Sequence, residues 1–239
     1  MNALKKIVSS ATGFWLHKIS SLPIGADLQV DIHRRMGAAS FTTIFDVGAN
    51  IGQSSQWFRS IEPRATIYCF EPVASTFALL RKATEKDNNI IIEHMAFGAA
   101  AGTKTIRLFD QFPVLNSLKD DLMNDNENAR EEIISVETID RYCLQKNIKR
   151  IDLLKIDTEG YELPVLEGSN QMLQEGRISF IYCEVGFSRR NTRNTYLPEL
   201  GEWLEIKGFH FFGLYQVASN GGVDRFGNAL FVHDSVYDG

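Results

Sequence analysis

Five short apolar runs, each followed by a small or acidic residue, constrain the fold of this 239-residue chain more than any other feature. They lie at residues 43–47, 65–70, 90–95, 151–156 and 178–183. Each is five or six residues long and rich in β-branched and aromatic side chains, which is typical of buried parallel strands. Helical patterns follow at residues 54–60, 74–85, 136–146 and 163–173. This rhythm predicts an α/β fold with a doubly wound, mostly parallel sheet.

The last part of the chain departs from this rhythm. A predicted helix at 196–207 precedes two predicted strands, 209–217 and 228–233, which a Ser-Asn-Gly-Gly run at 219–222 separates. Such a connection is typical of a β-hairpin, so these strands should be antiparallel. Residues 119–132 are rich in Asp, Glu and Asn and are expected to form a solvated loop or the start of a helix.

The charge balance and the cysteines narrow the classes of partner. The chain has 25 basic and 30 acidic residues, a net charge of −5, and this lack of basic excess argues against nucleic acid as the main partner. Cys69, Cys143 and Cys183 are an odd number of widely spaced cysteines, which favours reduced thiols and a cytoplasmic location. Their spacing also gives no zinc motif.

The N-terminus carries Lys5 and Lys6 before an apolar stretch at 7–16. Ser and Thr interrupt that stretch, so it is a poor secretion signal and too short and polar to span a bilayer. We therefore expect no transmembrane segment, although a basic amphipathic start leaves peripheral membrane contact open. Residues 1–40 are expected to form a helical extension to a domain at 41–239.

A glycine-containing turn after the first predicted strand points to a cofactor. Gly48 and Gly52 flank Asn50, where a dinucleotide-binding turn would have a third glycine, and this argues against NAD or FAD. Glu71 ends the second strand, where a carboxylate would bind ribose hydroxyls, and Pro72 turns the chain away. Together these residues suit a nucleoside ligand without phosphates, such as S-adenosyl-L-methionine.

These motifs resemble the FkbM family of methyltransferases. The matching segments are Asp46–Gln53 (DVGANIGQ), Phe70–Pro72 (FEP), Leu153–Glu162 (LLKIDTEGYE), Val165–Gly168 (VLEG) and Cys183–Glu184. The resemblance implies a seven-stranded Rossmann-like sheet, S-adenosyl-L-methionine over the first two strand ends, and O-methylation of an acceptor. It also implies that Asp46, Gly48, Asn50 and Glu71 contact the cofactor, and we add Gly52 and Pro72 to that set.

The predicted catalytic residues follow later strands. Asp157 and Glu159 alternate with Lys155, so an extended segment would point all three to one face. Glu184 ends the fifth strand, beside the fourth. Methylation of an alcohol needs a base or a metal. The three carboxylates could supply a base and its partner, or hold Mg²⁺ or Ca²⁺; without a ligand motif we predict no metal site.

His94 ends the third strand and is a further candidate base, because its pKa lies near working pH. Packing or contact with the cofactor is the alternative role for this histidine. A salt-bridged strand end, in which Lys155 neutralises Asp157, is likewise the structural alternative to catalysis at the fourth strand.

The family resemblance also suggests the acceptor. A hydroxyl of a sugar in a glycan or glycolipid is expected, with the fucose of a nodulation-type lipo-oligosaccharide as one example. O-methylation of a polyketide or other natural product is the alternative enzyme activity. A non-catalytic module that binds S-adenosyl-L-methionine is the alternative outside enzymes, and a nicotinamide-dependent reductase is disfavoured by Asn50. The residues favour no particular oligomeric state.

Overall fold

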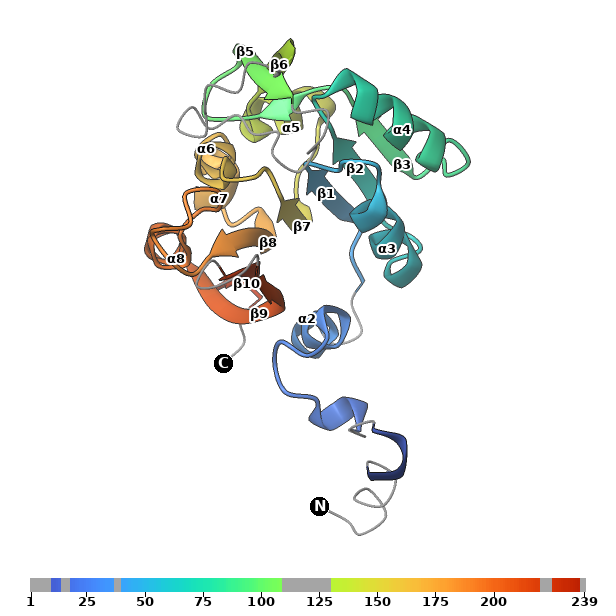
Figure 1. Ribbon diagram of the computed structural model, residues 1–239, viewed down its shortest axis with the longest axis vertical. Coiled ribbons are helices and arrows are strands. Elements are labelled where there is room, and N and C mark those ends of the chain that lie inside the picture. The colour runs from blue at the N-terminus through green and yellow to red at the C-terminus, as the bar shows by residue number, and fades with distance from the viewer. Residues whose placement is uncertain (1–9, 14–17, 37–39, 109–129, 220–224, 237–239) are drawn as a thin grey trace.

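The computed structural model describes residues 10–13, 18–36, 40–108, 130–219 and 225–236 (Figure 1). The helices are η1 (Ile19–Ser21), α2 (Leu28–Met36), α3 (Gln53–Ile61), α4 (Ala74–Thr84), α5 (Ile139–Lys146), α6 (Glu162–Glu167), α7 (Asn170–Gln174) and α8 (Leu197–Glu205). The strands are β1 (Thr43–Val47), β2 (Thr66–Phe70), β3 (Ile90–Glu93), β4 (Ala96–Phe97), β5 (Gly102–Leu108), β6 (Arg130–Glu137), β7 (Ile151–Ile156), β8 (Ile178–Gly186), β9 (Phe209–Ser219) and β10 (Arg225–His233).

Seven of the strands form one sheet in the order β3-β2-β1-β7-β8-β10-β9. The first five of these are parallel, and β10 runs antiparallel to both β8 and β9. The predicted fold class is therefore confirmed: a mostly parallel α/β sheet with an antiparallel pair at the end of the chain.

The two faces of the sheet bury alternate residues of the same strands. In β1, Phe45 faces a cluster that includes residues of α5, α6, α7 and α8, whereas Ile44 faces a cluster with α2, α3 and α4. Figure 1 shows α3 and α6 on opposite sides of the sheet. Strands buried on both faces explain why the sequence shows continuous apolar runs instead of alternation.

The strand order reverses between β1 and β7, because β2 and β3 continue one way and β8 the other. In open α/β sheets, ligands bind beyond the carboxyl ends of the strands at such a switch point. The segments that follow β1, β2, β7 and β8 are therefore the ones that can form a site.

A second, three-stranded sheet with the order β4-β6-β5 was not predicted. The expectation of a loop or helix start at 119–132 is wrong for Arg130–Glu132, which belong to β6, while residues 119–129 lie outside the described residues. Val136 is also in β6, so the predicted helix at 136–146 begins later, at Ile139. Several side chains of β6 are exposed and polar, so the sequence lacks the continuous apolar run that marks a buried strand.

The predicted helix at 163–173 is two short helices, α6 and α7. Gly168 lies between them. Only glycine fits at this position, because a Cβ there would be 2.1 Å from the carbonyl oxygen of Gly98. The two helices follow β7, as the pattern predicts, and pack on the sheet face that Phe45 occupies.

Within the predicted extension, α2 packs on the sheet. Leu28 and Ile32 of α2 join the cluster on one sheet face. The buried carboxylate of Asp31 accepts hydrogen bonds from Tyr215 Oη of β9 and from the amide of Gly25, each 2.8 Å long. Residues 1–9, 14–17 and 37–39 lie outside the described residues, and the domain boundary at residue 40 stays a prediction.

Candidate functional site

The turn after β1 approaches the end of β7 so closely that only glycine fits at its start. Gly48 has φ +75°, and a Cβ on it would lie 1.9 Å from the carbonyl oxygen of Asp157. A left-handed φ is also unfavourable for side chains other than those of Gly, Asn and Asp. Asn50, with φ 50°, and Gly52, with φ 94°, are of the types that tolerate it. The predicted turn therefore has the backbone that its residues indicated.

The amides of this turn are already paired within the chain. The N–H groups of Gly48 and Ala49 both donate to Phe70 O at 3.0 Å, and the Asn50 N–H donates to Glu71 Oε2 at 3.1 Å. Glu71 Oε1 accepts a further bond from the Val73 amide, 2.9 Å long. No amide from 48 to 50 is therefore left to bind a phosphate, and the third of them is bound by a carboxylate.

Glu71 is almost completely buried, with 6% of its surface exposed. Burial raises its pKa to about 7, although the amides of Val73 and Asn50 act in the opposite direction. Pro72 follows directly and leads the chain toward α4. Two lone pairs of the carboxylate are used by the chain, which leaves the others to accept hydroxyl hydrogen bonds.

Asp46 is fully buried, and its partners are within the protein. Ser55 Oγ donates to Asp46 Oδ2 at 2.5 Å, and the ammonium of Lys155 lies 2.9 Å from Asp46 Oδ1. Burial opposes the charge of Lys155, but Asp46 and Asp157 outweigh it and raise the pKa of the ammonium. The structure thus places Asp46 beneath the turn, and its predicted contact with a cofactor stays a prediction.

Lys155 joins the two parts of the site. Its ammonium also donates to Gly48 O at 3.0 Å and lies 3.5 Å from Asp157 Oδ2. The predicted salt bridge between Lys155 and Asp157 is therefore present, but Lys155 is closer to Asp46. One buried cation holds the turn after β1 against the end of β7.

Three carboxylates meet at the ends of β7 and β8. Oxygen atoms of Asp157, Glu159 and Glu184 lie within 4.8 Å of one another, and each residue is partly exposed. The sequence placed all three at the carboxyl ends of neighbouring strands, and the structure brings them together. Their catalytic role stays a prediction.

A loop after β8 holds two of these carboxylates. Arg193 donates from Nε to Glu159 Oε2 at 2.8 Å, and its Nη2 lies 2.7 Å from the same oxygen. Asn194 Nδ2 donates to Glu184 Oε2 at 2.5 Å. The sequence indicates that residues 188–195, rich in Arg and Asn after the fifth predicted strand, form either an acceptor-binding loop or an ordinary solvated loop. It does not predict these two contacts, because contacts between distant segments leave no local pattern.

Glu162 is a further buried carboxylate that the sequence analysis missed. It accepts from the amides of Thr158 and Gly160, both at 3.1 Å, and from the hydroxyl groups of Thr158 and Thr195. It therefore ties the loop that carries Asp157 and Glu159 to the loop that holds Glu184. A charged residue inside the first turn of a short helix was the only signal that could have revealed it.

Crowding of these acids changes their protonation. Burial raises the pKa of Glu159 to about 7, although Arg193 lowers it. Burial, followed by the charges of Asp157 and Glu159, raises the pKa of Glu184 to about 8. A carboxyl group with a pKa near neutrality can accept a proton from a substrate and release it afterwards.

The same three carboxylates are oxygen ligands of the type that Mg²⁺ and Ca²⁺ use. Two of them, however, already accept hydrogen bonds from Arg193 and Asn194. Among the described residues this is the single group of three or more His, Cys, Asp or Glu side chains with such geometry. An acidic cluster of this kind also occurs without a metal.

His94 lies apart from the carboxylates. It follows β3 at the edge of the sheet, three strands from β7, and neighbouring strands are about 4.8 Å apart. Its exposed ring stacks on Phe77 of α4, with 4.7 Å between ring centroids. The structure therefore does not bring His94 to the group with which it was expected to act, and its position fits the alternative of packing or cofactor contact.

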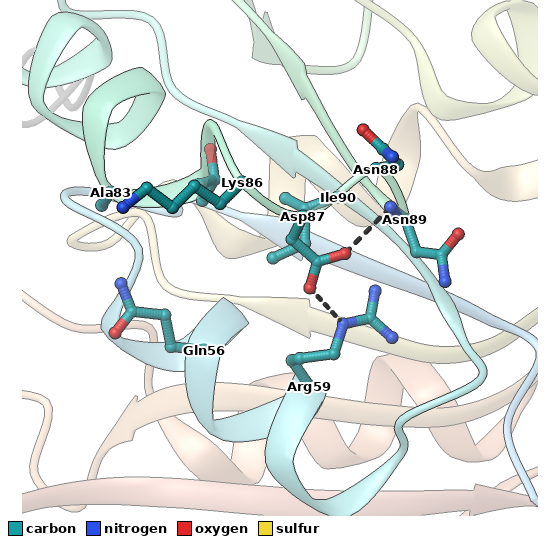
Figure 2. A pocket seen from close by; sticks show the side chains of 9 residues that line it. Gln56, Arg59, Ala83, Lys86, Asp87, Asn88, Asn89 and Ile90 are labelled. Atoms are coloured by element: carbon teal, nitrogen blue, oxygen red, sulfur yellow. Dashed lines mark hydrogen bonds and ion pairs between the residues drawn. The ribbon is translucent and has the colours of Figure 1, made fainter.

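An open cavity of about 570 Å³ lies elsewhere (Figure 2). It is formed by α3, the end of α4 and the turn before β3, with Gln56, Arg59, Lys86 and Asp87 among its lining residues. Figure 2 shows Arg59 paired with Asp87, 2.7 Å from Nε to Oδ2. The cavity lies at the amino end of β3, opposite the edge where the candidate site lies, and no predicted site residue lines it.

The segments that build the site match a known family. The sequence model described as "Methyltransferase FkbM domain" matches residues 46–211, more than half of the chain.

Two characterised relatives are similar over part of the chain. The 2-O-methyltransferase NoeI of Sinorhizobium fredii is 27% identical over 152 residues, 59% of this chain and 62% of that protein. The hexuronic acid methyltransferase AglP of Haloferax volcanii is 24% identical over 144 residues, 59% of this chain and 55% of that protein. This chain thus spans little more than half the length of either relative. Among solved structures, the METTL16 methyltransferase domain is similar with a TM-score of 0.49 and 11% identity, covering 98% of this chain and 78% of that one.

Proposed function

This chain belongs to the FkbM methyltransferase family, and from that premise we propose that it is an S-adenosyl-L-methionine-dependent O-methyltransferase acting on a sugar hydroxyl. One observation carries the proposal. A turn whose amides from Gly48 to Asn50 are all paired within the chain adjoins three clustered carboxylates, and Lys155 contacts both parts. A nucleoside methyl donor and a base for the acceptor would then lie next to each other.

The turn fits this cofactor by its chemistry. Glu71 can accept the ribose hydroxyl groups, and a carboxylate repels phosphate. Gly48, Asn50 and Gly52 allow the backbone of the turn to approach a nucleoside closely. Pro72 would direct the following chain away from that nucleoside. We assign Asp46 a supporting role in this set, because Ser55 and Lys155 hold it under the turn.

S-adenosyl-L-methionine, when bound, supplies a methyl group on a positively charged sulfur. The protein must align the acceptor oxygen with that methyl carbon and remove the hydroxyl proton. We assign proton removal to Glu184, whose pKa is raised to about 8, because its ionised form is a stronger base than that of Glu159, whose pKa is about 7 and whose carboxylate Arg193 holds. The new C–O bond forms as the C–S bond breaks, and the proton passes to the carboxylate.

The other two carboxylates would orient the acceptor. The side chain of Asp157 is more exposed than that of Glu159, at 39% against 23%. It lies beside the turn through Lys155, so it can accept a hydroxyl hydrogen bond near the methyl position. Glu159, fixed by Arg193, would keep the site negative and raise the basicity of Glu184.

The sugar acceptor is supported by the names of two relatives, which act on a 2-hydroxyl and on a hexuronic acid. We extend this to the present chain as a class, a hydroxyl of a glycan or glycolipid. Residues 41–239 would form the catalytic domain and residues 1–40 an extension, of which α2 would border the acceptor side through its contact with β9. Among the described residues no helix is long and apolar enough to cross a membrane.

Calorimetric titration with S-adenosylhomocysteine, with NADH as control, tests the cofactor. We expect micromolar binding of the former alone and its loss in Glu71→Ala. Transfer of a labelled methyl group to a panel of methyl pyranosides then tests the reaction. Glu184→Gln should lower kcat by about 10²–10⁴-fold with the S-adenosylhomocysteine affinity unchanged. Preferential NADH binding would refute the cofactor, and an unchanged kcat in Glu184→Gln would refute the base.

A further inference from the structure

The far side of the carboxylate group, away from the turn, is built from neutral polar side chains on β8, β9 and β10. Asn228 of β10 is the direct register partner of Glu184 of β8. Side chains of directly opposed residues lie on the same face with Cβ atoms about 4.5–5.5 Å apart. Tyr182 lies two residues before Glu184 on the same face. An amide and a phenol thus adjoin the proposed base.

A β-bulge adds a second amide to this group. The β9–β10 register shifts between Phe226 and Asn228, and Gln216 takes φ +50° there. The conformation brings Gln216 Oε1 within 3.0 Å of Asn228 Nδ2, which donates to it, and within 3.5 Å of Tyr182 Oη. A left-handed φ is unfavourable for a residue other than glycine. Bulges and strained residues cluster where a side chain must be aimed at a ligand.

The N-terminal segment covers the outer side of the same group. Gly25 approaches β9 so closely that a Cβ would lie 2.5 Å from Leu214 O. Tyr215, adjacent to Gln216, donates to the buried Asp31 of α2 and packs edge-on against Tyr182. The bulge therefore lies between a fixed wall and the carboxylates and cannot shift without breaking these contacts.

We propose that Gln216, Asn228 and Tyr182 form an acceptor subsite that binds the hydroxyl neighbouring the one to be methylated, and that the acceptor ring is neutral. The inference rests on the proposed function and adds the recognition of the acceptor to it. The Gln216 amide N–H₂ and the Asn228 carbonyl offer one donor and one acceptor, which a sugar hydroxyl matches. Three adjacent carboxylates disfavour an anionic ring, because Arg193 is already bound to Glu159.

Methyl transfer from labelled S-adenosyl-L-methionine to methyl pyranosides tests the subsite. The panel contains neutral glycosides of fucose, rhamnose, glucose and galactose, methyl glucuronide, and the monodeoxy analogues of the best substrate. We expect a neutral glycoside to be preferred over the glucuronide. The analogue that lacks the neighbouring hydroxyl should have a KM about tenfold higher, since the Gln216 and Asn228 amides then lose that partner.

Gln216→Gly removes the side chain at a position where glycine is the least strained residue, so the fold should be retained. Its KM for the parent sugar should rise about tenfold. The ratio of the KM for the deoxy analogue to the KM for the parent sugar should fall close to one in this variant. A merely structural role of Gln216 would not change that ratio. Tyr182→Phe, which removes only the hydroxyl, should weaken discrimination less. Asn147→Gly is the matched control, because Asn147 is an exposed amide with φ 57° at the end of α5.

The outcomes separate the two proposals. If a pyranoside is methylated and Gln216→Gly keeps the parent KM and the discrimination, the subsite is refuted and the proposed function stands. If methyl glucuronide is the best substrate, the neutral acceptor is refuted. If S-adenosylhomocysteine binds but no pyranoside is methylated, the sugar acceptor of the proposed function is refuted, and the subsite with it.

Discussion

The turn after β1 and the loop after β7 face each other across the switch point, yet they hold charge in different ways. Beside the turn, Glu71 is almost completely buried, and backbone amides bind both of its oxygens. In the loop, Asp157 and Glu159 meet Glu184, and side chains of another loop hold them. The first arrangement is rigid and suits binding. The second keeps acids close enough to change their pKa and suits proton transfer.

The largest expected effect tests the rigidity of the turn. Gly48→Ala would place a methyl group 1.9 Å from a backbone carbonyl of β7, where no rotamer change can relieve the overlap. We expect a loss of about 4–5 kcal/mol in the free energy of unfolding, or no folded protein. Urea denaturation measures it. A variant with near wild-type stability would show that the turn and β7 can move apart.

The second prediction breaks the connection between the two regions. Lys155→Met keeps the volume of the side chain but leaves Asp46 buried and uncompensated. Removing one partner of a buried ion pair costs about 3–5 kcal/mol. Urea denaturation at neutral pH should show this loss. Near wild-type stability of the variant would indicate that the charge of Lys155 is not needed at this position.

Much of this organisation follows from local sequence, and the exceptions have physical causes. The five parallel strands are buried on both faces, so their apolar runs are visible in the sequence. The meeting of Asp157, Glu159 and Glu184 was predictable because neighbouring parallel strands end at the same edge. Strand order is not a local property, so the sequence could not show that His94 lies three strands from this group.

The contacts that the supporting residues make could not be predicted from the sequence. Glu162 and Arg193 act through contacts with segments about 30 residues away. The complete burial of Asp46 depends on Lys155 reaching it from a neighbouring strand. In the sequence, an acidic residue at a strand end indicates a ligand contact, whether its side chain faces a cofactor or a lysine in the folded protein. Only three-dimensional packing distinguishes the two cases.

The third prediction concerns the acid-rich region and pH. The pKa values of Glu159 and Glu184 are raised from 4.5 to about 7 and about 8, and that of Glu71 to about 7. Between pH 4.5 and about pH 8, the folded state therefore binds more protons than the unfolded state. Stability from these groups is complete below pH 4.5 and is lost as the pH rises through 7–8. We expect the free energy of unfolding to fall by about 2–4 kcal/mol from pH 5 to pH 8.5.

A matched variant identifies the source of that slope. Glu184→Gln removes the group with the highest of the three pKa values, so its stability should change less between pH 5 and pH 8.5. Glu175→Gln is the control, because Glu175 is an exposed carboxylate at the end of α7, outside the cluster. Equal slopes in Glu184→Gln and wild type would mean that the pH dependence arises elsewhere.

The smallest expected effect separates two glycines of the same turn. Gly52 shares a left-handed φ with Gly48, but a Cβ on it would meet the Leu80 Cδ1 atom at 3.0 Å, the far end of a flexible side chain. Gly52→Ala should cost only the backbone strain of about 1–2 kcal/mol, and Gly52→Asn less, since Asn tolerates this conformation. Both variants should still bind S-adenosylhomocysteine in calorimetry. If Gly52→Ala destabilised the protein as much as Gly48→Ala, strain throughout the turn, and not its contact with β7, would set its rigidity.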